Sequence, residues 1–286
     1  MWKDYRISKA AVMLNEWCRK WAAYLSPFKG EVVFRKEFPR LYELRDSMKN
    51  PDAEDSCLRN LDQDLQHEVV RRIWSRIELD LRGLDADAWT FLKSEALLCV
   101  NTWDEKSSRR GSPRGRELLL NILYQAKAYN FLKTKDCSAI HFITRAPKKG
   151  KRTPDLEGIS STARFLCEVK TINRSEEEVY RQRVEKKYLH DHSKLAEEFF
   201  AKVGGVIENA KVQLEAYDPK GEATHIVYVI MNFDDFWGDY KELNIRQLDE
   251  YLCAHPVPGI ELVLHNLWTV FNRSMTLKCA TVVNDE

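Results

Sequence analysis

The sequence predicts an α/β fold, in which an all-α N-terminal region precedes a mixed central sheet flanked by helices. Three observations lead to this fold class. Apolar residues within residues 1–100 recur at spacings of three and four, as they do on one face of a helix. The rest of the chain alternates helical patterns with short apolar strands. One of these strands, residues 226–231, is apolar on both faces, which is typical of a central strand covered by helices.

In the N-terminal region we predict helices over residues 10–25, 66–81 and 87–100, where apolar side chains keep the helical spacing. Gly83 closes the second of these helices. Residues 49–64 are acidic and rich in turn formers, which indicates a connecting segment. Five tryptophans precede residue 90. We interpret them as core anchors of this helical region rather than as stacking platforms for nucleobases.

Residues 104–115 are polar and basic and are interrupted by glycine and proline, so we place the domain boundary there. The predicted domains are a helical domain over residues 1–112 and an α/β domain over residues 113–286. In the second domain the patterns predict a helix at 116–132, strands at 138–143 and 163–172, a helix at 193–217, a strand at 225–233, a helix at 244–252, and strands at 260–264 and 275–283.

Composition is that of a globular protein, with 286 residues of which 44% are apolar and 31% charged. No apolar run approaches the roughly 18 residues of a membrane span. The first residues lack the apolar segment of a secretory signal. The seven cysteines are odd in number and never form a CxxC pair. We therefore expect a cytoplasmic protein in a reducing compartment, without a disulfide framework or zinc site.

Charge is distributed unevenly although the net charge is only +1. Residues 105–152 hold 13 Lys and Arg against 3 Asp and Glu, whereas residues 50–95 hold 6 against 11. A basic stretch of this kind suits a polyanionic partner such as nucleic acid. The alternative is a solvated basic loop without a partner.

One segment combines an acid, Asp155, with an apolar run that leads into Glu168-Val169-Lys170. Alternation along a strand places Glu168 and Lys170 on one face, while Val169 points the other way. The carboxylate of Asp155 arrives from the preceding turn as the second acid. Asp155, Glu168 and Lys170 together can then hold a divalent cation and a water. Metal-assisted phosphodiester hydrolysis requires side chains that bind a metal ion and position a water in this way. The alternative is a solvent-exposed ion pair between Glu168 and Lys170 at a sheet edge.

Pro154-Asp155 followed by Glu168-Val169-Lys170 resembles the motif of the PD-(D/E)xK phosphodiesterase superfamily. This superfamily includes restriction endonucleases, Holliday-junction resolvases and repair nucleases. The resemblance covers residues 116–235, and the predicted order of helix, strand, strand or turn, strand, helix and strand is also the order of the superfamily's core. It implies a restriction-endonuclease-like sheet, with the Asp on the second strand and the Glu and Lys on the third.

The resemblance also implies the roles of these residues. Asp155 and Glu168 would bind Mg²⁺, for which Mn²⁺ can substitute, together with the backbone carbonyl of Val169. Mg²⁺ prefers oxygen ligands and keeps several waters, so two carboxylates and a substrate phosphate suffice. Lys170 would orient the attacking water, or act as a base if burial depresses its pKa. The products would carry 5′-phosphate and 3′-hydroxyl ends.

Three further residues have two interpretations each. Glu157 lies two residues from Asp155 and shares its face in an extended segment, so either could be the first metal ligand. Glu117 matches the place of an extra metal-binding carboxylate in many relatives, but it is equally an acid that complements a helix dipole. Gln213 resembles a polar residue near the site of some relatives and could equally lie on the surface.

The expected partner is nucleic acid, with DNA favoured over RNA and endonucleolytic cleavage favoured, and no membrane; a homodimer is left open. Backbone phosphates would be held by five basic residues, Arg145, Lys148, Lys149, Lys151 and Arg152. The charged segment 173–194 is either a solvated face or a flap over the substrate. The alternative function is a catalytically inactive protein with a nuclease fold, acting as a nucleic-acid-binding or protein-interaction module. P-loop, GxGxxG, HExxH and GxSxG patterns are missing from the sequence, which argues against several other enzyme classes.

Overall fold

The computed structural model of the chain describes residues 33–48, 58, 60–107, 114–144, 153–173, 195, 197–232, 241–266 and 281–284. These residues form a mixed α/β structure with a helical N-terminal region, as the sequence predicts. None of the helices in the described residues combines the length and apolar character needed to cross a membrane.

Six strands of the described residues form one sheet in the order β1-β2-β3-β4-β5-β6. Strands β1 to β3 pair antiparallel, and β3 to β6 pair parallel, so the sheet is mixed. The strands are β1 (Ala139–Phe142), β2 (Leu156–Ile159), β3 (Arg164–Asn173), β4 (Thr224–Asn232), β5 (Glu261–Asn266) and β6 (Thr281–Asn284).

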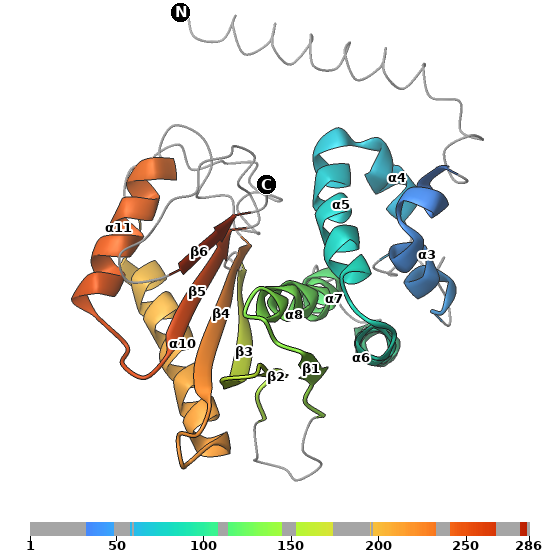
Figure 1. The fold of residues 1–286 in the computed structure, drawn as a ribbon. Helices are drawn as coiled ribbons and strands as arrows, with labels where there is room; N and C mark the ends of the chain where they lie inside the picture. Colours follow the sequence, from blue (N-terminus) through green and yellow to red (C-terminus); the bar gives the residue numbers. More distant parts are fainter. Residues whose placement is uncertain are drawn as a thin grey trace, which may run out of the picture.

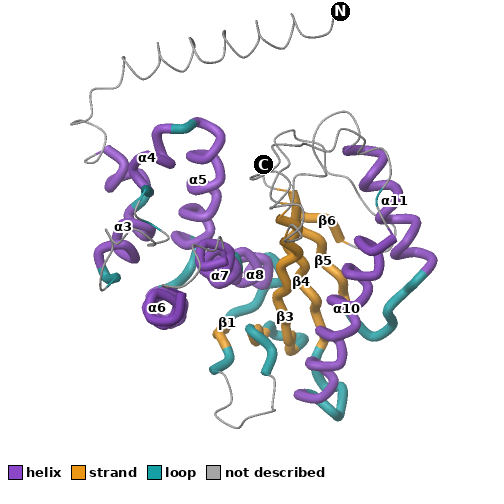
Figure 2. The backbone as a smooth tube through the Cα atoms, turned by 180° about the vertical axis from the view of Figure 1, so that it is seen from behind, coloured by secondary structure: helices purple, strands orange, loops and turns teal. Residues whose placement is uncertain are grey.

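Helices cover both faces of this sheet (Figures 1 and 2). α10 and α11 lie on one face, and α7 and α8 lie on the other, with α3 to α6 beyond them. The described helices are α3 (Pro39–Asp46), α4 (Leu61–Gln66), α5 (Glu68–Arg82), α6 (Ala86–Ser107), α7 (Arg114–Leu123), α8 (Gln125–Lys133), α10 (Glu197–Tyr217) and α11 (Lys241–Ala254).

Alternation along β3 divides its side chains between two hydrophobic cores. Leu166 and Ile172 pack under α10 and α11 with Val227 and Val229 of β4. Cys167, on the opposite face, belongs to a core that also includes the buried side chains of α3 to α8. The helical region and one face of the sheet therefore share one continuous core. The even-numbered residues of β3, including Glu168 and Lys170, belong to the α10 face.

Most of the predicted elements agree with the structure to within a few residues. The strand predicted at 163–172 is β3, the one predicted at 225–233 is β4, and the helix predicted at 66–81 corresponds to α5. The last predicted strand is described only at its end, as β6. The helix predicted at 10–25 lies outside the described residues.

Three differences from the predicted elements have local causes. The helix predicted at 116–132 is interrupted at Tyr124, where the N–H of Lys127 bonds to the Tyr124 carbonyl in a tighter turn, which separates α7 from α8. α3 was not predicted, because it is short and begins at Pro39. α4 begins inside the segment 49–64 that composition assigned to turns.

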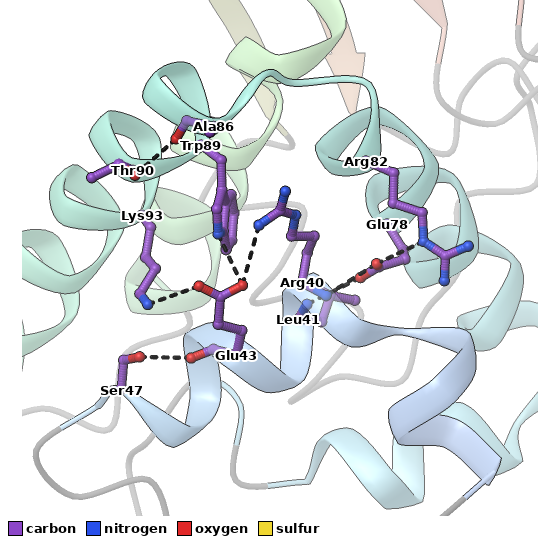
Figure 3. Close-up of polar contacts among 10 residues, drawn as sticks. All are labelled: Arg40, Leu41, Glu43, Ser47, Glu78, Arg82, Ala86, Trp89, Thr90 and Lys93. Atoms are coloured by element: carbon purple, nitrogen blue, oxygen red, sulfur yellow. Dashed lines mark hydrogen bonds and ion pairs between the residues drawn. The ribbon is translucent and has the colours of Figure 1, made fainter.

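The N-terminus of α3 is capped by a residue from α5 (Figure 3). The buried carboxylate of Glu78 accepts the backbone N–H groups of Arg40 at 3.1 Å and Leu41 at 3.0 Å. Burial raises the pKa of Glu78 above its ordinary value, and the hydrogen bonds from Arg40, Leu41 and Arg82 oppose that rise. The first N–H groups of a helix have no partner within it, so this contact fixes α3 against α5.

Candidate active site

Asp155 is positioned by the backbone at the start of β2. Its N–H donates to the carbonyl of Cys167 at 3.1 Å, and its carbonyl accepts the N–H of Ile143 at 2.9 Å. Because Leu156 pairs with Cys167, Asp155 lies beside β3 at the level of Glu168. The segment is thus tied to both of its neighbouring strands, and the two acids of the motif come together from adjacent strands.

The carboxylate of Asp155 has a donor at each oxygen. Oδ2 accepts the backbone N–H of Val169 at 2.8 Å, and Oδ1 accepts the side-chain amide of Gln125 at 3.3 Å. Val169 belongs to β3 and Gln125 is the first residue of α8. Two hydrogen bonds from different elements fix the orientation of a carboxylate, because rotation would break at least one of them.

Glu168 is buried in the sheet, with 3% of its surface exposed. Its Oε1 forms an ion pair with the ammonium of Lys170, which is on the same face of β3. Its Oε2 accepts the amide of Gln213 at 2.7 Å, and the same amide nitrogen donates to the carbonyl of Thr153 at 2.7 Å. Gln213 therefore connects α10 to β3 and to the segment that carries Asp155.

The electrostatic environment of Glu168 disfavours its charged form. Desolvation by burial, reinforced by the negative charge of Asp155, raises the pKa of Glu168 from its ordinary value of 4.5 to about 8. Lys170 and the hydrogen bond from Gln213 act in the opposite direction without cancelling the effect. A further positive charge beside the two carboxylates would lower this pKa and stabilise the ionised pair.

Glu157 is on the same face of the sheet but is bound to different partners. Its Oε1 accepts the Nε–H of Arg164 at 2.5 Å, and its Oε2 lies 2.8 Å from Nε2 of His141. The structure thus places Asp155, and not Glu157, beside Glu168. Glu157 forms a separate ion-pair cluster one row further along the sheet.

Other residues singled out in the sequence are not described in full. The backbone of Glu117 lies in α7, but its side chain is outside the described part of the chain. Also outside it are segment 174–194 and the five basic residues Arg145, Lys148, Lys149, Lys151 and Arg152. Within the described residues, no group of three or more His, Cys, Asp or Glu side chains is placed to hold a metal ion. The described site offers two carboxylates.

Gln125 is a site residue that the sequence did not indicate. It lies in the middle of the segment predicted as one continuous helix, where its contact with Asp155 has no signature in spacing or composition. The turn at Tyr124 could not be read from apolar periodicity either, because apolar side chains keep the helical spacing from Leu119 to Leu132 on both sides of it. Only the packing of α8 against the sheet brings Gln125 to the carboxylate.

The site as a whole joins two acids, one ammonium and two amides. Asp155 and Glu168 supply oxygen ligands of the type that Mg²⁺ binds, and Lys170 supplies a hydrogen-bond donor next to them. Gln125 of α8 and Gln213 of α10 donate to the two carboxylates, and these two helices lie on opposite faces of the sheet. A comparison of the chain with protein-family models, curated proteins and solved structures found no match.

Proposed function

We propose that the protein is a metal-dependent phosphodiesterase that hydrolyses nucleic acid, with DNA as the substrate and Mg²⁺ as the cofactor. One observation carries this proposal. Asp155 and Glu168 lie together on adjacent strands, and the Lys170 ammonium contacts Glu168 on the same face. This is the acid-acid-lysine set that the PD-(D/E)xK resemblance requires.

The topology supports a restriction-endonuclease-like sheet. In chain order the elements of the described residues run α8, β1, β2, β3, α10 and β4. β1 to β3 form an antiparallel meander, and β4 joins β3 in parallel after the crossover helix α10. The resemblance implies this order, with the first acid at the second strand and the Glu-x-Lys on the third. The motif and the strand pairing are independent observations, and both favour the same family.

The residues of the site fit a divalent cation. A buried carboxyl beside a second carboxylate is an arrangement that a positive charge stabilises, since burial and the charge of Asp155 raise the pKa of Glu168. Asp155, Glu168 and the carbonyl of Val169 would hold the ion. The Val169 N–H faces Asp155, and in a strand the N–H and carbonyl of one residue point to the same side. Its carbonyl therefore faces the same edge.

The chain's own groups have distinct tasks in this proposal. Lys170 positions the attacking water through its ammonium. Gln213 and Gln125 keep the two carboxylates oriented. Bound Mg²⁺ would lower the pKa of a water ligand and offset negative charge on the phosphate. The basic residues between Arg145 and Arg152 would contact backbone phosphates on either side of the bond that is cut.

The test compares cleavage by the wild type with cleavage by Lys170→Ala and Asp155→Asn. Plasmid, linear and single-stranded DNA and an RNA are incubated with Mg²⁺ or with EDTA. We expect metal-dependent cleavage by the wild type and a loss of at least a hundredfold in both variants, with binding retained. Lys135→Ala is the matched control, because Lys135 forms a similar partly exposed ion pair, at 2.7 Å with Glu261, away from the site.

Each alternative function predicts a different result. Binding to DNA that weakens steeply with salt, but without cleavage in Mg²⁺ or Mn²⁺, would favour the inactive nucleic-acid-binding protein. No affinity for DNA or RNA at low salt would favour a protein-interaction module. Equal cleavage by the wild type and Lys170→Ala would remove Lys170 from the proposed mechanism.

A further inference from the structure

We infer that Arg164 binds a backbone phosphate of the nucleic acid, on the hairpin of β1 and β2 and at a distance from the two acids. The inference rests on the proposed function, and it names a residue that neither the motif nor the basic segment 145–152 includes. Three observations lead to it: the fixed orientation of the guanidinium, the exposure of the hairpin, and the place of Arg164 on β3.

Glu157 holds the guanidinium of Arg164 by one edge. Its Oε1 accepts the Nε–H of Arg164 at 2.5 Å, and its Oε2 lies 2.8 Å from Nε2 of His141. Because each oxygen of Glu157 has its own partner, rotation of the carboxylate would break at least one contact. A guanidinium carries five N–H groups, and the contact with Glu157 uses the one on Nε. The two terminal amino groups form the fork that binds two oxygens of a phosphate.

Asp218, directly after α10, is a second carboxylate whose charge acts on Arg164. Its Oδ2 accepts the backbone N–H of Ala223 at 2.8 Å and lies 3.2 Å from Nε2 of His225. Asp218 and His225 are both buried, whereas the side chain of Arg164 is partly exposed. In the described part of the chain, Glu157 is therefore the acid that contacts the guanidinium, and Asp218 acts on it from further away.

The hairpin of β1 and β2 presents an accessible face next to Arg164. Gly158 faces α8, so its neighbours Glu157 and Ile159 point to the opposite face. Arg164 pairs with Ile159 in the sheet. The exposed fraction is 53% for the side chain of His141, 43% for Ile159 and 36% for the side chain of Arg164. A large partner can thus reach the guanidinium over this part of the sheet.

Arg164 lies on the same strand and the same face as Glu168. Four positions separate the two residues, which corresponds to about 13 Å along β3. Lys170 continues the row on the other side of Glu168. A strand that presents one phosphate to the two acids extends past them, and we assign Arg164 to a phosphate on the side away from Lys170. A contact at this distance does not touch the bond that is cut, but it fixes the register of the strand.

A structural ion pair between Arg164 and Glu157 is the alternative, and it differs from a phosphate contact in its salt dependence. Each phosphate that a protein neutralises releases counterions. The slope of log K against log salt therefore falls by about 0.9 when one phosphate contact to duplex DNA is lost. Loss of an ion pair that does not touch the nucleic acid leaves this slope unchanged.

The experiment measures binding of a labelled DNA duplex to the full chain in EDTA, over roughly 50–200 mM salt. We expect Arg164→Gln to bind about tenfold more weakly at low salt and to lower the slope by about 0.9. Arg164→Lys keeps the charge but not the fork, so it should keep the slope and bind with intermediate affinity. In Mg²⁺, Arg164→Gln should raise KM for DNA by about tenfold and change kcat by less than about threefold.

Arg71→Gln is the matched control. Arg71 of α5 forms an ion pair at 2.5 Å with Glu37, its side chain is 43% exposed, and α5 lies beyond the helices that cover the sheet (Figure 1). The control removes the same charge and should leave the slope and KM unchanged. Thermal melts of all variants separate loss of binding from loss of fold. If Arg164→Gln does not fold, the affinity of Arg164→Lys decides, and an affinity equal to that of the wild type would overturn the inference.

The outcomes distinguish this inference from the proposed function. A slope and a KM equal to those of the wild type in Arg164→Gln would overturn the inference, while cleavage by the wild type would keep the phosphodiesterase proposal. Equal losses in Arg71→Gln would also overturn it, because they would show an effect of net charge alone. An equally lowered slope in Arg164→Lys would overturn it as well, because the charge is still present. Failure of the wild type both to bind and to cleave nucleic acid would overturn the proposed function itself.

Discussion

The Asp155 carboxylate accepts the backbone N–H of Val169 at 2.8 Å, so a side chain occupies a hydrogen-bonding position at the edge of β3. Pro154, the residue before Asp155, has no N–H of its own. The bond places the first acid of the motif directly beside the segment that carries the second acid and the lysine. The relative positions of Asp155 and Glu168 therefore depend on backbone geometry more than on flexible side chains.

Replacing Gln213 should weaken the site without unfolding the protein. Gln213→Leu removes the donor to Glu168 and the contact with Thr153. We expect activation by Mg²⁺ to require about 10- to 100-fold more metal, as is usual when a partner of a metal ligand is lost. The measurement is the rate of cleavage against Mg²⁺ concentration. An unchanged activation curve would mean that Gln213 only connects α10 to the sheet.

Mg²⁺ affinity should increase with pH. The pKa of Glu168 is about 8 in the metal-free protein, and only the ionised carboxylate binds the cation. Below pH 8 each bound ion must displace a proton, so affinity should rise by up to about tenfold per pH unit and level off above pH 8. Calorimetry in buffers with different ionisation enthalpies counts the released proton. An affinity independent of pH between 6 and 8 would contradict the raised pKa.

Glu168→Gln should stabilise the metal-free protein at pH 8. The folded-state pKa of Glu168 is raised from 4.5 to about 8. The contribution of the protonated carboxyl to folding stability is therefore fully present below pH 4.5 and is lost as the pH rises towards 8. A neutral amide avoids this loss, which we place on the order of 1–3 kcal/mol because the carboxyl is buried. Denaturant unfolding at pH 4 and pH 8 measures the difference. Equal stability changes at the two pH values would count against the prediction.

Glu157→Gln should retain Mg²⁺-dependent cleavage, in contrast to Asp155→Asn. The Glu157 carboxylate is occupied by Arg164 and His141, and it is not held beside Glu168. We expect Glu157→Gln to keep its rate within about threefold, the range of an indirect electrostatic effect of about 0.6 kcal/mol. The rates of both variants are compared at saturating Mg²⁺. A loss in Glu157→Gln as large as that in Asp155→Asn would make Glu157 the first ligand.

Two glycines should respond oppositely to substitution by alanine. A Cβ at Gly158 in β2 would lie 2.9 Å from Sγ of Cys137, so Gly158→Ala should cost about 1–3 kcal/mol. A Cβ at Gly205 in α10 would meet nothing within 4 Å, and Gly205→Ala should stabilise the protein by about 0.5–1 kcal/mol. Melting temperatures measure both changes. A neutral Gly158→Ala would show that Cys137 moves aside at little cost.

The sequence predicted the elements better than it predicted the contacts between them. Periodicity reports which positions are buried, and it located β3, β4 and α5 because each buries a regular apolar face. Strand alternation likewise placed Glu168 and Lys170 on one face, where the structure has their ion pair. Gln125 could not be found in this way, since its contact with Asp155 joins residues 30 positions apart across two elements.

The sequence could not decide between Asp155 and Glu157 for the same reason, because the deciding contacts join different elements. Both acids share a face in an extended segment, and alternation cannot tell which of them lies beside β3 at the level of Glu168. Arg164 and His141 decide the position of Glu157, and both come from other strands. Tertiary contacts of this kind are invisible to local pattern, so the sequence left the alternative open.

The core on the α8 face has a consequence for mutations far from the two acids. Leu156 directly follows Asp155 in the chain, and Cys167 directly precedes Glu168. Both are buried in the same core as Trp74 of α5 and Trp89 of α6. Close-packed interiors transmit strain. Volume changes at either tryptophan should therefore alter the spacing of the acids, so loss of activity in a variant does not by itself identify a residue of the site.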